Sequence, residues 1–422
     1  MIITFQYRIK PTPKQITIME TWSELLRRHW NFALAQRLDW LNRTRCQIDR
    51  CSRIYEPIGE VPERVDYYSQ QSALKGTKKL FPEYANMYSE VQQMNLQRLD
   101  KAWKRWLVPD KTGRRRGRPK FKGRSEKPSF SFSRVNQAKA ACFLEGDILR
   151  IPKIGSIPIT VHRPIPEGFT PKTATICFKA DGYYVSISAE DATIPTPRPL
   201  DEVKSAVGID LGLKEFLATS NGEFVPVPQI YRKALQTLAR QHRELARKKD
   251  GSKNRAKAKA RVAKIHQRIS RQRKMFHYRT AHWLCRDYDL IAVEELNIPG
   301  LARTRLAKSI YDVSWGKFIS ILEAVVVKYG VHLLKVNPHN TTLNCSGCGT
   351  KVPKTLSVRL HECPKCNLEM DRDENAAINI LFKALNAVGL TVSACGGLGD
   401  SQPVKQESSS VRMKDAHVKL SL

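Results

Sequence analysis

The sequence predicts a multidomain α/β protein, and three observations support this fold class. The chain has 422 residues, enough for two or three domains with sizeable cores. Short strand-like runs separated by Gly and Pro fill residues 130–190, whereas apolar runs and amphipathic helices alternate beyond residue 205. Two Cys-x-x-Cys pairs lie between residues 345 and 366, a pattern typical of a small zinc-binding unit.

The N-terminal region is predicted to be a strand followed by helices. Residues 2–9 alternate as in a strand, and Thr12 can then cap a helix whose first position is Pro13. Two more helical stretches are expected, from about residue 69 to 80 and from 82 to 107. The first helix has an apolar face made of Trp22, Leu26, Trp30, Leu34, Leu38 and Leu41.

A strongly basic segment, RRRGRPKFKGR, occupies residues 114–124 and is too rich in Gly, Pro and charge to fold alone. One interpretation is a solvated loop. The other is a segment that grips phosphates, with an aromatic ring that can stack on a base or ribose. The charge of the whole chain favours the second. The candidate nucleic-acid-binding residues are Arg114, Arg115, Arg116, Arg118, Lys120, Phe121 and Lys122.

Residues 130–190 are predicted to form a small barrel or curled sheet, which the first strand of the chain could complete. Asp181-Gly182 is a hairpin-turn signal within this region. The Pro-rich segment at 192–202 follows and is the clearest domain boundary.

Two apolar strands in the second half of the chain end in a carboxylate. Residues 206–209 form a short buried run that ends at Asp210, and residues 290–293 form another that ends at Glu294. Further elements are expected as strands at 216–219 and 331–336, a turn at Asn221-Gly222 and a helix at 315–329.

A long basic helical hairpin is predicted between these two strands. Residues 231–280 hold many Lys and Arg but only two acids, and GSKN at 251–254 breaks the helical pattern. A solvated charged face is one interpretation, but the dominance of one sign favours a polyanionic partner. The candidate nucleic-acid-binding residues here are Lys257, Arg261, Lys264 and Arg268.

The paired cysteines Cys345, Cys348, Cys363 and Cys366 predict one structural zinc site. Each Cys-x-x-Cys turn offers two sulfurs, and four thiolates suit tetrahedral zinc. The alternative is four buried or disulfide-bonded cysteines. That alternative does not account for the Cys-x-x-Cys spacing, which occurs twice. Disulfides are also not expected in a chain without a secretory signal.

The helix after the cysteines begins with Asp371, Asp373 and Glu374. Asp371 is placed to cap this helix, whereas Asp373 falls on its apolar stripe. An inward carboxylate is costly unless a metal ion or a buried Arg meets it. The alternative is that all three acids only complement the helix dipole.

Asp210, Glu294 and Asp373 together suggest a metal-dependent nuclease. Each lies at the edge of a predicted core, and three clustered carboxylates repel one another unless divalent metals neutralise them. Magnesium prefers hard oxygen ligands, and two such ions suit phosphodiester hydrolysis.

The formal net charge of +32 indicates a polyanionic partner, and nucleic acid is the leading candidate. No long apolar run supports a membrane partner. The N-terminal segment lacks signal-peptide features, so we expect a cytoplasmic protein. The remaining cysteines are scattered and are expected to be reduced thiols.

Four motifs in combination resemble the TnpB family of transposon-encoded proteins, which is similar to the small type V CRISPR effectors. The motifs are GIDLG at 208–212, VEELNIPGL at 293–301, the cysteine pairs at 345–366 and DRDENAAIN at 371–379. The resemblance covers roughly residues 1–390. One departure is Asn367, where the family often has Gly; Asn tolerates the left-handed conformation, so we expect this turn to form.

The resemblance implies an RNase H-like RuvC nuclease domain at 201–340 and 371–390, with a zinc ribbon inserted at 341–370. It also implies a barrel-like wedge domain at 1–12 and 125–195 and a helical recognition domain at 13–124, and we expect a disordered tail at 391–422. By motif match, Asp210, Glu294 and Asp373 take the roles of the metal-binding acids. Arg359 matches an arginine that assists at the active site.

The resemblance also implies RNA-guided cleavage of double-stranded DNA. It further implies a prokaryotic protein that associates with the nucleoid when bound to DNA. The expected partners are a guide RNA from the transposon end and a DNA target with a short adjacent motif. Two alternatives stay open: an RNA-independent, structure-selective nuclease or resolvase, and a DNA-binding regulator on the same scaffold. The regulator should have lost at least one of the three acids, and all three are present.

Overall fold

The structure is a computed structural model, and it describes residues 2–46, 63–110, 113–191, 195–355 and 358–390. The chain divides into two compact units, Met1–Thr193 and Ile194–Leu422, which are described separately below. The division falls at the start of the Pro-rich segment. The tail expected to be disordered, residues 391–422, lies outside the described residues.

The first unit contains an antiparallel sheet with the order β2-β6-β7-β1-β5-β4-β3. The first strand of the chain lies inside this sheet, paired on one side with β7 and on the other with β5. A bridge between Val135 and Cys142 joins the chain after β2 to the chain before β3, so the two ends of the sheet approach each other. The strands are β1 (Ile2–Ile9), β2 (Phe130–Phe132), β3 (Phe143–Glu145), β4 (Ile148–Ile151), β5 (Gly155–Thr160), β6 (Phe169–Lys179) and β7 (Gly182–Asp191).

The helices of the first unit pack along one long helix, α1 (Pro13–Cys46). Trp22 and Leu26 of α1 contribute to the core over the sheet, whereas Trp30 and Leu34 pack in a second core with α5. The other helices are α2 (Tyr67–Ser72), α3 (Leu74–Leu80), α4 (Pro82–Ala85) and α5 (Ser89–Leu107).

The single helix expected from residue 82 to 107 is wrong, because α4 and α5 are separate. Tyr88 has an extended backbone, with φ −66° and ψ 131°, which ends the helical run. The break is supported by Gln92, whose side-chain amide donates to the Tyr84 carbonyl at 2.7 Å. It also lets Met87 turn inward, where its side chain is buried. The stretch from 69 to 80 is likewise divided, at Ala73.

The second unit is built on a five-stranded sheet with the order β10-β9-β8-β11-β12. The three strands β8, β11 and β12 are parallel, and β9 and β10 extend the sheet as antiparallel strands. Each strand expected in this half of the chain is present. Their bounds are β8 (Ala206–Asp210), β9 (Glu215–Thr219), β10 (Phe224–Pro226), β11 (Leu290–Glu294) and β12 (His332–Val336).

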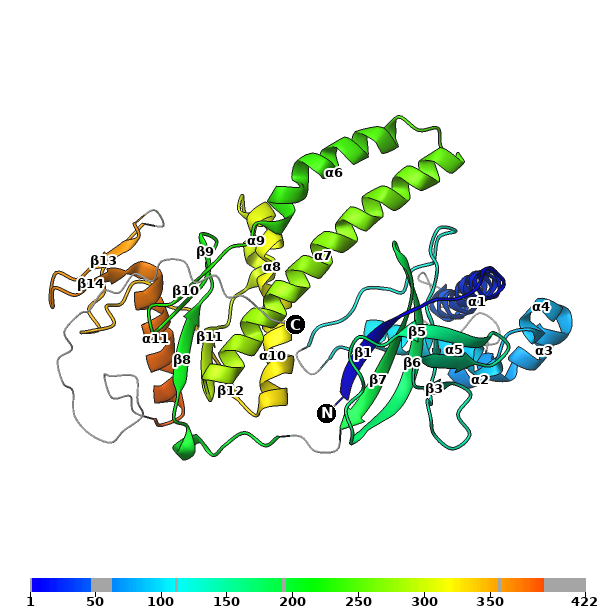
Figure 1. Ribbon diagram of the computed structural model, residues 1–422, viewed down its shortest axis with the longest axis horizontal. Helices are drawn as coiled ribbons and strands as arrows, with labels where there is room; N and C mark the ends of the chain where they lie inside the picture. Colours follow the sequence, from blue (N-terminus) through cyan, green and yellow to red (C-terminus); the bar gives the residue numbers. More distant parts are fainter. Residues whose placement is uncertain (1, 47–62, 111–112, 192–194, 356–357, 391–422) are drawn as a thin grey trace, which may run out of the picture. The chain divides into compact units, whose positions relative to one another are not determined.

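Helices cover both faces of this sheet (Figure 1). Val207 and Ile209 of β8 face α7 (Lys253–Asp287) and α10 (Trp315–Tyr329), where Phe318 and Leu322 complete the core. The opposite face is covered by α11 (Arg372–Ala387), which packs on β8 and β11. The short elements are a 3-10 turn at Leu200–Glu202, α8 (Ile298–Leu301) and α9 (Ala307–Val313).

Gly208 explains the close fit of α11 on the sheet. Because side chains alternate along a strand, Gly208 faces α11 while its two neighbours face the other core. A Cβ atom at Gly208 would lie 2.0 Å from the carbonyl oxygen of Ala377, a distance that no side chain can occupy. The glycine therefore brings the backbone of α11 directly against the end of β8.

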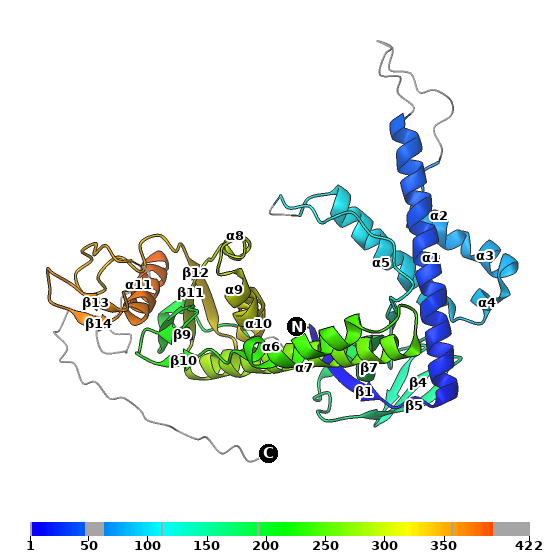
Figure 2. The ribbon, with the colours of Figure 1, turned by 90° about the horizontal axis from the view of Figure 1, so that it is seen from above.

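The predicted basic hairpin is formed by α6 (Ile230–Ala246) and α7, which contact each other, are seen as two separate helices in Figure 1 and overlap in the view of Figure 2. Ser252 caps α7 by accepting a hydrogen bond from the amide of Arg255, and Gly251 turns the chain with φ +77°. A small hairpin, β13 (Leu360–Glu362) and β14 (Glu369–Asp371), precedes α11. Among the described residues, no helix is both long and apolar enough to span a membrane.

Candidate active site and cysteine cluster

Asp210 and Glu294 lie beside each other at the carboxyl ends of β8 and β11. The two strands are parallel, and Ile209 pairs with Val293, so the next residue on each strand is an acid. The Asp210 side chain keeps some exposure, but protein atoms crowd it on most sides. This desolvation, with the nearby charges of Glu294 and Asp373, raises the pKa of Asp210 to about 8.

Glu294 is held by a neighbour that is distant in the sequence. The hydroxyl of Thr341, a buried residue, donates a hydrogen bond to its carboxylate. Desolvation raises the pKa of Glu294, although this hydrogen bond and the charge of Lys383 oppose the shift. Lys383 itself is anchored at the His339 carbonyl.

Asp373 reaches the same end of the sheet from the first turn of α11. Asp371 caps this helix, as predicted: its carboxylate accepts a hydrogen bond from the amide of Asp373 at 2.7 Å. A Cβ atom at Gly212, just beyond the end of β8, would lie 3.9 Å from Oδ2 of Asp373. The third acid therefore lies beside the strand that carries Asp210, and its side chain is buried.

Two arginines meet the buried carboxylate of Asp373. Arg359 donates to Oδ2 at 2.8 Å, and the guanidinium of Arg372 donates to Oδ1 at 2.9 and 3.1 Å. Arg372 is buried and also donates to the Val358 carbonyl at 3.1 Å. Of the two partners that an inward carboxylate can have, a metal ion or a buried arginine, this structure contains the arginine.

The three acids are less tightly grouped than the cysteines. Among the described residues, the four cysteines are the one group of metal-ligand atoms that all lie within 4.8 Å of one another. A cavity of about 190 Å³ opens beside Asp373 and Arg359, with Lys214 on its wall. Carboxylate oxygens are the ligands that magnesium prefers, and an ionised carboxylate that accepts hydrogen bonds keeps lone pairs for a metal, so the chemistry of the three acids fits this ion.

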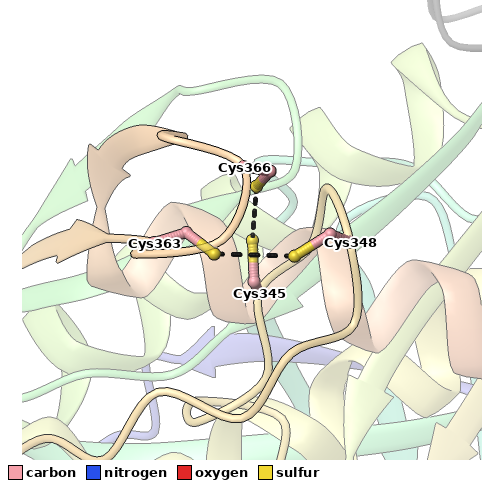
Figure 3. Close-up of side chains that lie close together, drawn as sticks. All are labelled: Cys345, Cys348, Cys363 and Cys366. Carbon is pink, nitrogen blue, oxygen red and sulfur yellow. Dashed lines mark hydrogen bonds between the residues drawn. The ribbon is translucent and has the colours of Figure 1, made fainter.

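Cys345, Cys348, Cys363 and Cys366 converge on one point, as Figure 3 shows. The Sγ atoms of Cys345 and Cys366 are 3.6 Å apart, and those of Cys348 and Cys363 are 3.5 Å apart. Zn–S bonds of about 2.3 Å in a tetrahedron require sulfurs roughly 3.8 Å apart, so the cluster fits zinc with little adjustment.

The two cysteine turns have the same backbone design. Gly349 follows the first turn and Asn367 follows the second, with φ values of 72° and 57°. Their amides donate to the carbonyls of Cys345 and Cys363 at 2.8 and 2.9 Å. The expectation that Asn367 takes the left-handed conformation is confirmed. Hydrogen bonding with Thr350 lowers the pKa of Cys348, whereas burial raises the pKa of Cys345 to about 12.

The basic segment of the first unit is held against α1 as an extended strap. The side chain of Asn31 bonds both backbone groups of Lys122, at 2.9 and 2.8 Å, and Trp30 donates to the Lys120 carbonyl at 3.1 Å. Phe121 is 54% exposed between these anchors, as stacking requires. Side chains exposed to solvent are those of Arg114, Arg115, Arg116, Arg118, Lys120 and Phe121.

Lys122 differs from its neighbours in this strap. Its ammonium group lies 3.9 Å from the centre of the Trp30 ring, and burial lowers its pKa to about 8. Lys122 therefore packs on the protein, whereas the sequence alone suggested a phosphate contact.

The candidate residues of the helical hairpin all lie on its exposed side. Lys257, Arg261, Lys264 and Arg268 are exposed, while Val262 and Ile269 are buried. Arg261 approaches Glu244 of α6 at 3.7 Å, and this surface pair is weak. The hairpin therefore presents a row of cations to solvent.

Sequence reasoning missed four residues that hold the site together: Thr341, Arg372, Asn375 and Asn379. A signal for two of them was present, because Asn375 and Asn379 are four residues apart on the apolar face of α11. Buried amides at this spacing indicate hydrogen-bonding partners outside the helix. Those partners could not be identified without the fold.

Comparison with protein families gives three matches along the chain. Residues 186–305 match a family described as a probable transposase, and residues 315–380 match a Cas12f1-like TNB domain. Residues 1–46, which form β1 and α1, match a family described as a helix-turn-helix domain.

Comparison with individual proteins extends the similarity to most of the chain. A Streptomyces pristinaespiralis protein named "Putative RNA-guided DNA endonuclease" is 31% identical over 403 residues, which are 93% of this chain and 90% of that protein. The Escherichia coli protein InsQ, with the same designation, is 26% identical over 76% of this chain and 79% of its own length. A solved structure of a Cas12f1–sgRNA–target DNA complex aligns with 90% of this chain and 98% of its own at 13% identity, with a TM-score of 0.47. On the sequence matches, this chain belongs to the TnpB family of OrfB-type transposon proteins.

Proposed function

We propose that this protein is an RNA-guided DNA endonuclease encoded by a transposon. The observation that carries the proposal is the meeting of Asp210, Glu294 and Asp373 at one end of the β8–β11 sheet, in a member of the TnpB family. The net charge of +32 supports a nucleic-acid partner.

We assign the nuclease to a RuvC-like, RNase H-like domain at residues 201–340 and 371–390. The order of its sheet and the packing of α11 on β8 support this assignment. The inserted residues 341–370 are the zinc ribbon. In the first unit, residues 1–12 and 125–195 form the wedge domain, and residues 13–124 form the recognition domain.

The three acids would hold magnesium, as a pair of ions. When bound, magnesium supplies an activated water and stabilises the leaving oxygen of a phosphodiester. Asp210 and Glu294 lie at the ends of paired strands, so their backbones are fixed relative to each other. Asp373 would offer a carboxylate oxygen to the metal, and Arg359, the more exposed of its two arginines, would be the easier one to displace.

Arg359 then has a second role. Arg359 lines the cavity next to Asp373, so its guanidinium would be able to donate to a phosphate oxygen of a substrate bound there. Its proposed role is therefore to bind the phosphate, while Arg372 stays buried and keeps Asp373 in place.

The experiment compares cutting of a plasmid target with and without RNA. The protein is purified with RNase and then supplied with magnesium, the target and a candidate RNA from the transposon end. We expect site-specific cutting only with RNA, and the cut should move when the 3′ segment of the RNA is rewritten. Asp210→Ala should bind DNA without cutting it, whereas Glu323→Ala, which removes an exposed acid of α10, should cut normally.

Other results would overturn the proposal. Equal, site-specific cutting without RNA would identify an RNA-independent nuclease or resolvase. Binding of DNA with RNA but without cutting by the wild-type protein would identify a DNA-binding regulator.

A further inference from the structure

The first cysteine turn is attached to α11 by two buried asparagines. Asn375 donates to the carbonyl of Asn344 at 2.8 Å and accepts a hydrogen bond from the amide of Ser346 at 2.9 Å. Asn379, one turn later, donates to the carbonyls of Asn344 and Thr341 at 2.7 and 2.8 Å. Two side chains thus bind three backbone groups of the segment 341–346, which contains the first metal ligand.

The same segment also holds the second acid. Thr341 accepts from Asn379 through its carbonyl and donates to Glu294 through its hydroxyl. Thr341 is 1% exposed, so water does not compete for either bond. A continuous chain of contacts therefore runs from α11, which carries Asp373, to the end of β11, which carries Glu294.

The second cysteine turn is attached to the third acid in a different way. β13 begins immediately after Arg359, and β14 ends at Asp371, with Leu360 and Asp371 paired across the hairpin. The amide of Arg372 donates to the carbonyl of Arg359 at 2.7 Å. Closing the hairpin around Cys363 and Cys366 therefore places Arg359 opposite Asp373.

We infer that Asn375 and Asn379 are positioning residues that transmit the geometry of the cysteine cluster to the acid site. The inference rests on the proposed function, because it concerns the affinity of the acids for their divalent metal. Loss of the Asn379 amide leaves the Thr341 carbonyl buried without a donor, and the segment 341–346 has to move to satisfy it. That movement changes the position of Glu294 relative to Asp373.

Binding of Mn²⁺ to the full-length protein, followed by electron paramagnetic resonance without nucleic acid, tests the inference. We expect Asn379→Ala to weaken Mn²⁺ binding about tenfold, while zinc stays at one per chain. Asn386→Ala on the exposed side of the same helix is the matched control and should bind Mn²⁺ as the wild type does. Thr341→Val keeps the shape of the side chain, removes the hydroxyl from Glu294 and should also weaken Mn²⁺ binding.

Cutting assays give a second readout, the metal concentration needed for half-maximal cutting. This concentration does not depend on how much of the protein is folded. With guide and target present, Asn379→Ala should need about tenfold more metal for half-maximal cutting, and excess metal should restore the maximal rate. A variant that only loses folded protein would show a lower maximal rate at an unchanged metal requirement.

The outcomes separate this inference from the proposed function. If the wild type binds Mn²⁺ and Asp210→Ala abolishes that binding, the acid site is the metal site. Equal Mn²⁺ affinity of the wild type, Asn379→Ala and Thr341→Val would then overturn the inference alone. Absence of Mn²⁺ binding by the wild type would overturn the metal site of the proposed function, and the inference with it. If Asn379→Ala does not fold, the Mn²⁺ affinity of Thr341→Val decides whether the inference holds.

Discussion

The ionised side chain of Asp210 destabilises the metal-free folded protein. The proposed chemistry nevertheless needs a carboxylate at this position. Desolvation of the Asp210 carboxylate and the nearby charges of Glu294 and Asp373 raise its pKa to about 8, although the charge of Arg372 opposes the shift. An unfolded chain ionises this group near its ordinary pKa of 3.8, so the folded state binds an extra proton between these two pH values. Stability therefore falls as pH rises through this window in the absence of a divalent metal.

Asp210→Asn should stabilise the metal-free protein and abolish cutting. The neutral amide removes the ionisation penalty, so the free energy of unfolding should rise by up to about 4 kcal/mol at pH 7 and by much less at pH 4. Urea unfolding of the second unit at both pH values, with no magnesium added, measures this difference. Asp287→Asn changes an exposed acid of the same unit and should have little effect at either pH. A lower stability of Asp210→Asn at pH 7 would show that the carboxylate makes stabilising contacts.

At the scale of the element, the fit of α11 on β8 depends on one glycine. Gly208→Ala should destabilise the second unit by about 3 kcal/mol, because its Cβ would overlap the backbone of α11 at Ala377. The displaced helix would carry Asp373 away from the other acids, so cutting should also be lost. Thermal unfolding measures the change.

The control for this substitution is Gly316→Ala in α10. Its Cβ would meet only the side chain of Ile298, at 3.4 Å, and alanine is the better helix former, so stability should be unchanged or slightly higher. A Gly208→Ala protein as stable as this control would mean that α11 is not packed as closely as described.

The cysteine turns should fold around one zinc ion per chain. Cys363→Ser combined with Cys366→Ser removes half of the ligand set, and metal analysis should then find zinc lost from the purified protein. Cys177→Ser, which changes a thiol of the first unit, should retain one zinc. Stoichiometric zinc in the double variant would exclude the four-cysteine site.

The elements that carry the acids could be predicted from the sequence because their signals are local. An apolar run that stops at Asp210 or Glu294 marks a strand end, and Asp371 before an apolar stripe marks a helix cap. The division of the helix at Tyr88 has no such local signal, since it depends on Met87 packing in a core formed with residues that are distant in the sequence. The hydrogen bond from Asn379 to the Thr341 carbonyl likewise could not be predicted. It joins residues on either side of the cysteine turns and depends on how the chain between them folds.

At the scale of the whole molecule, the surplus of positive charge should be visible as salt dependence. Removing a side chain that neutralises one phosphate reduces the slope of log affinity against log salt by about 0.7–0.9. Replacing Arg114, Arg115 and Arg116, all exposed, with Ala should therefore reduce the slope for RNA binding by roughly 2–3. Binding measured over a series of salt concentrations gives the slope.

A control that removes the same number of charges elsewhere distinguishes a specific effect of the strap from an effect of the total charge. Lys127, Arg150 and Lys172 are each paired with an acid of the first unit, so their replacement with Ala should leave the slope almost unchanged. If both triple variants reduce the slope equally, RNA is bound by the general charge and the strap has no special role.

The place of α11 in the chain has a consequence for the order of synthesis. Asp373 emerges from the ribosome roughly 160 residues after Asp210, on the order of 10–30 s later at about 5–20 residues per second. Until then β8 exposes the face at Gly208 that α11 will cover, and the site holds two acids of three. The first unit has time to fold during this interval. With the proposed acid site, the growing chain would be unable to cut DNA until α11 has been translated.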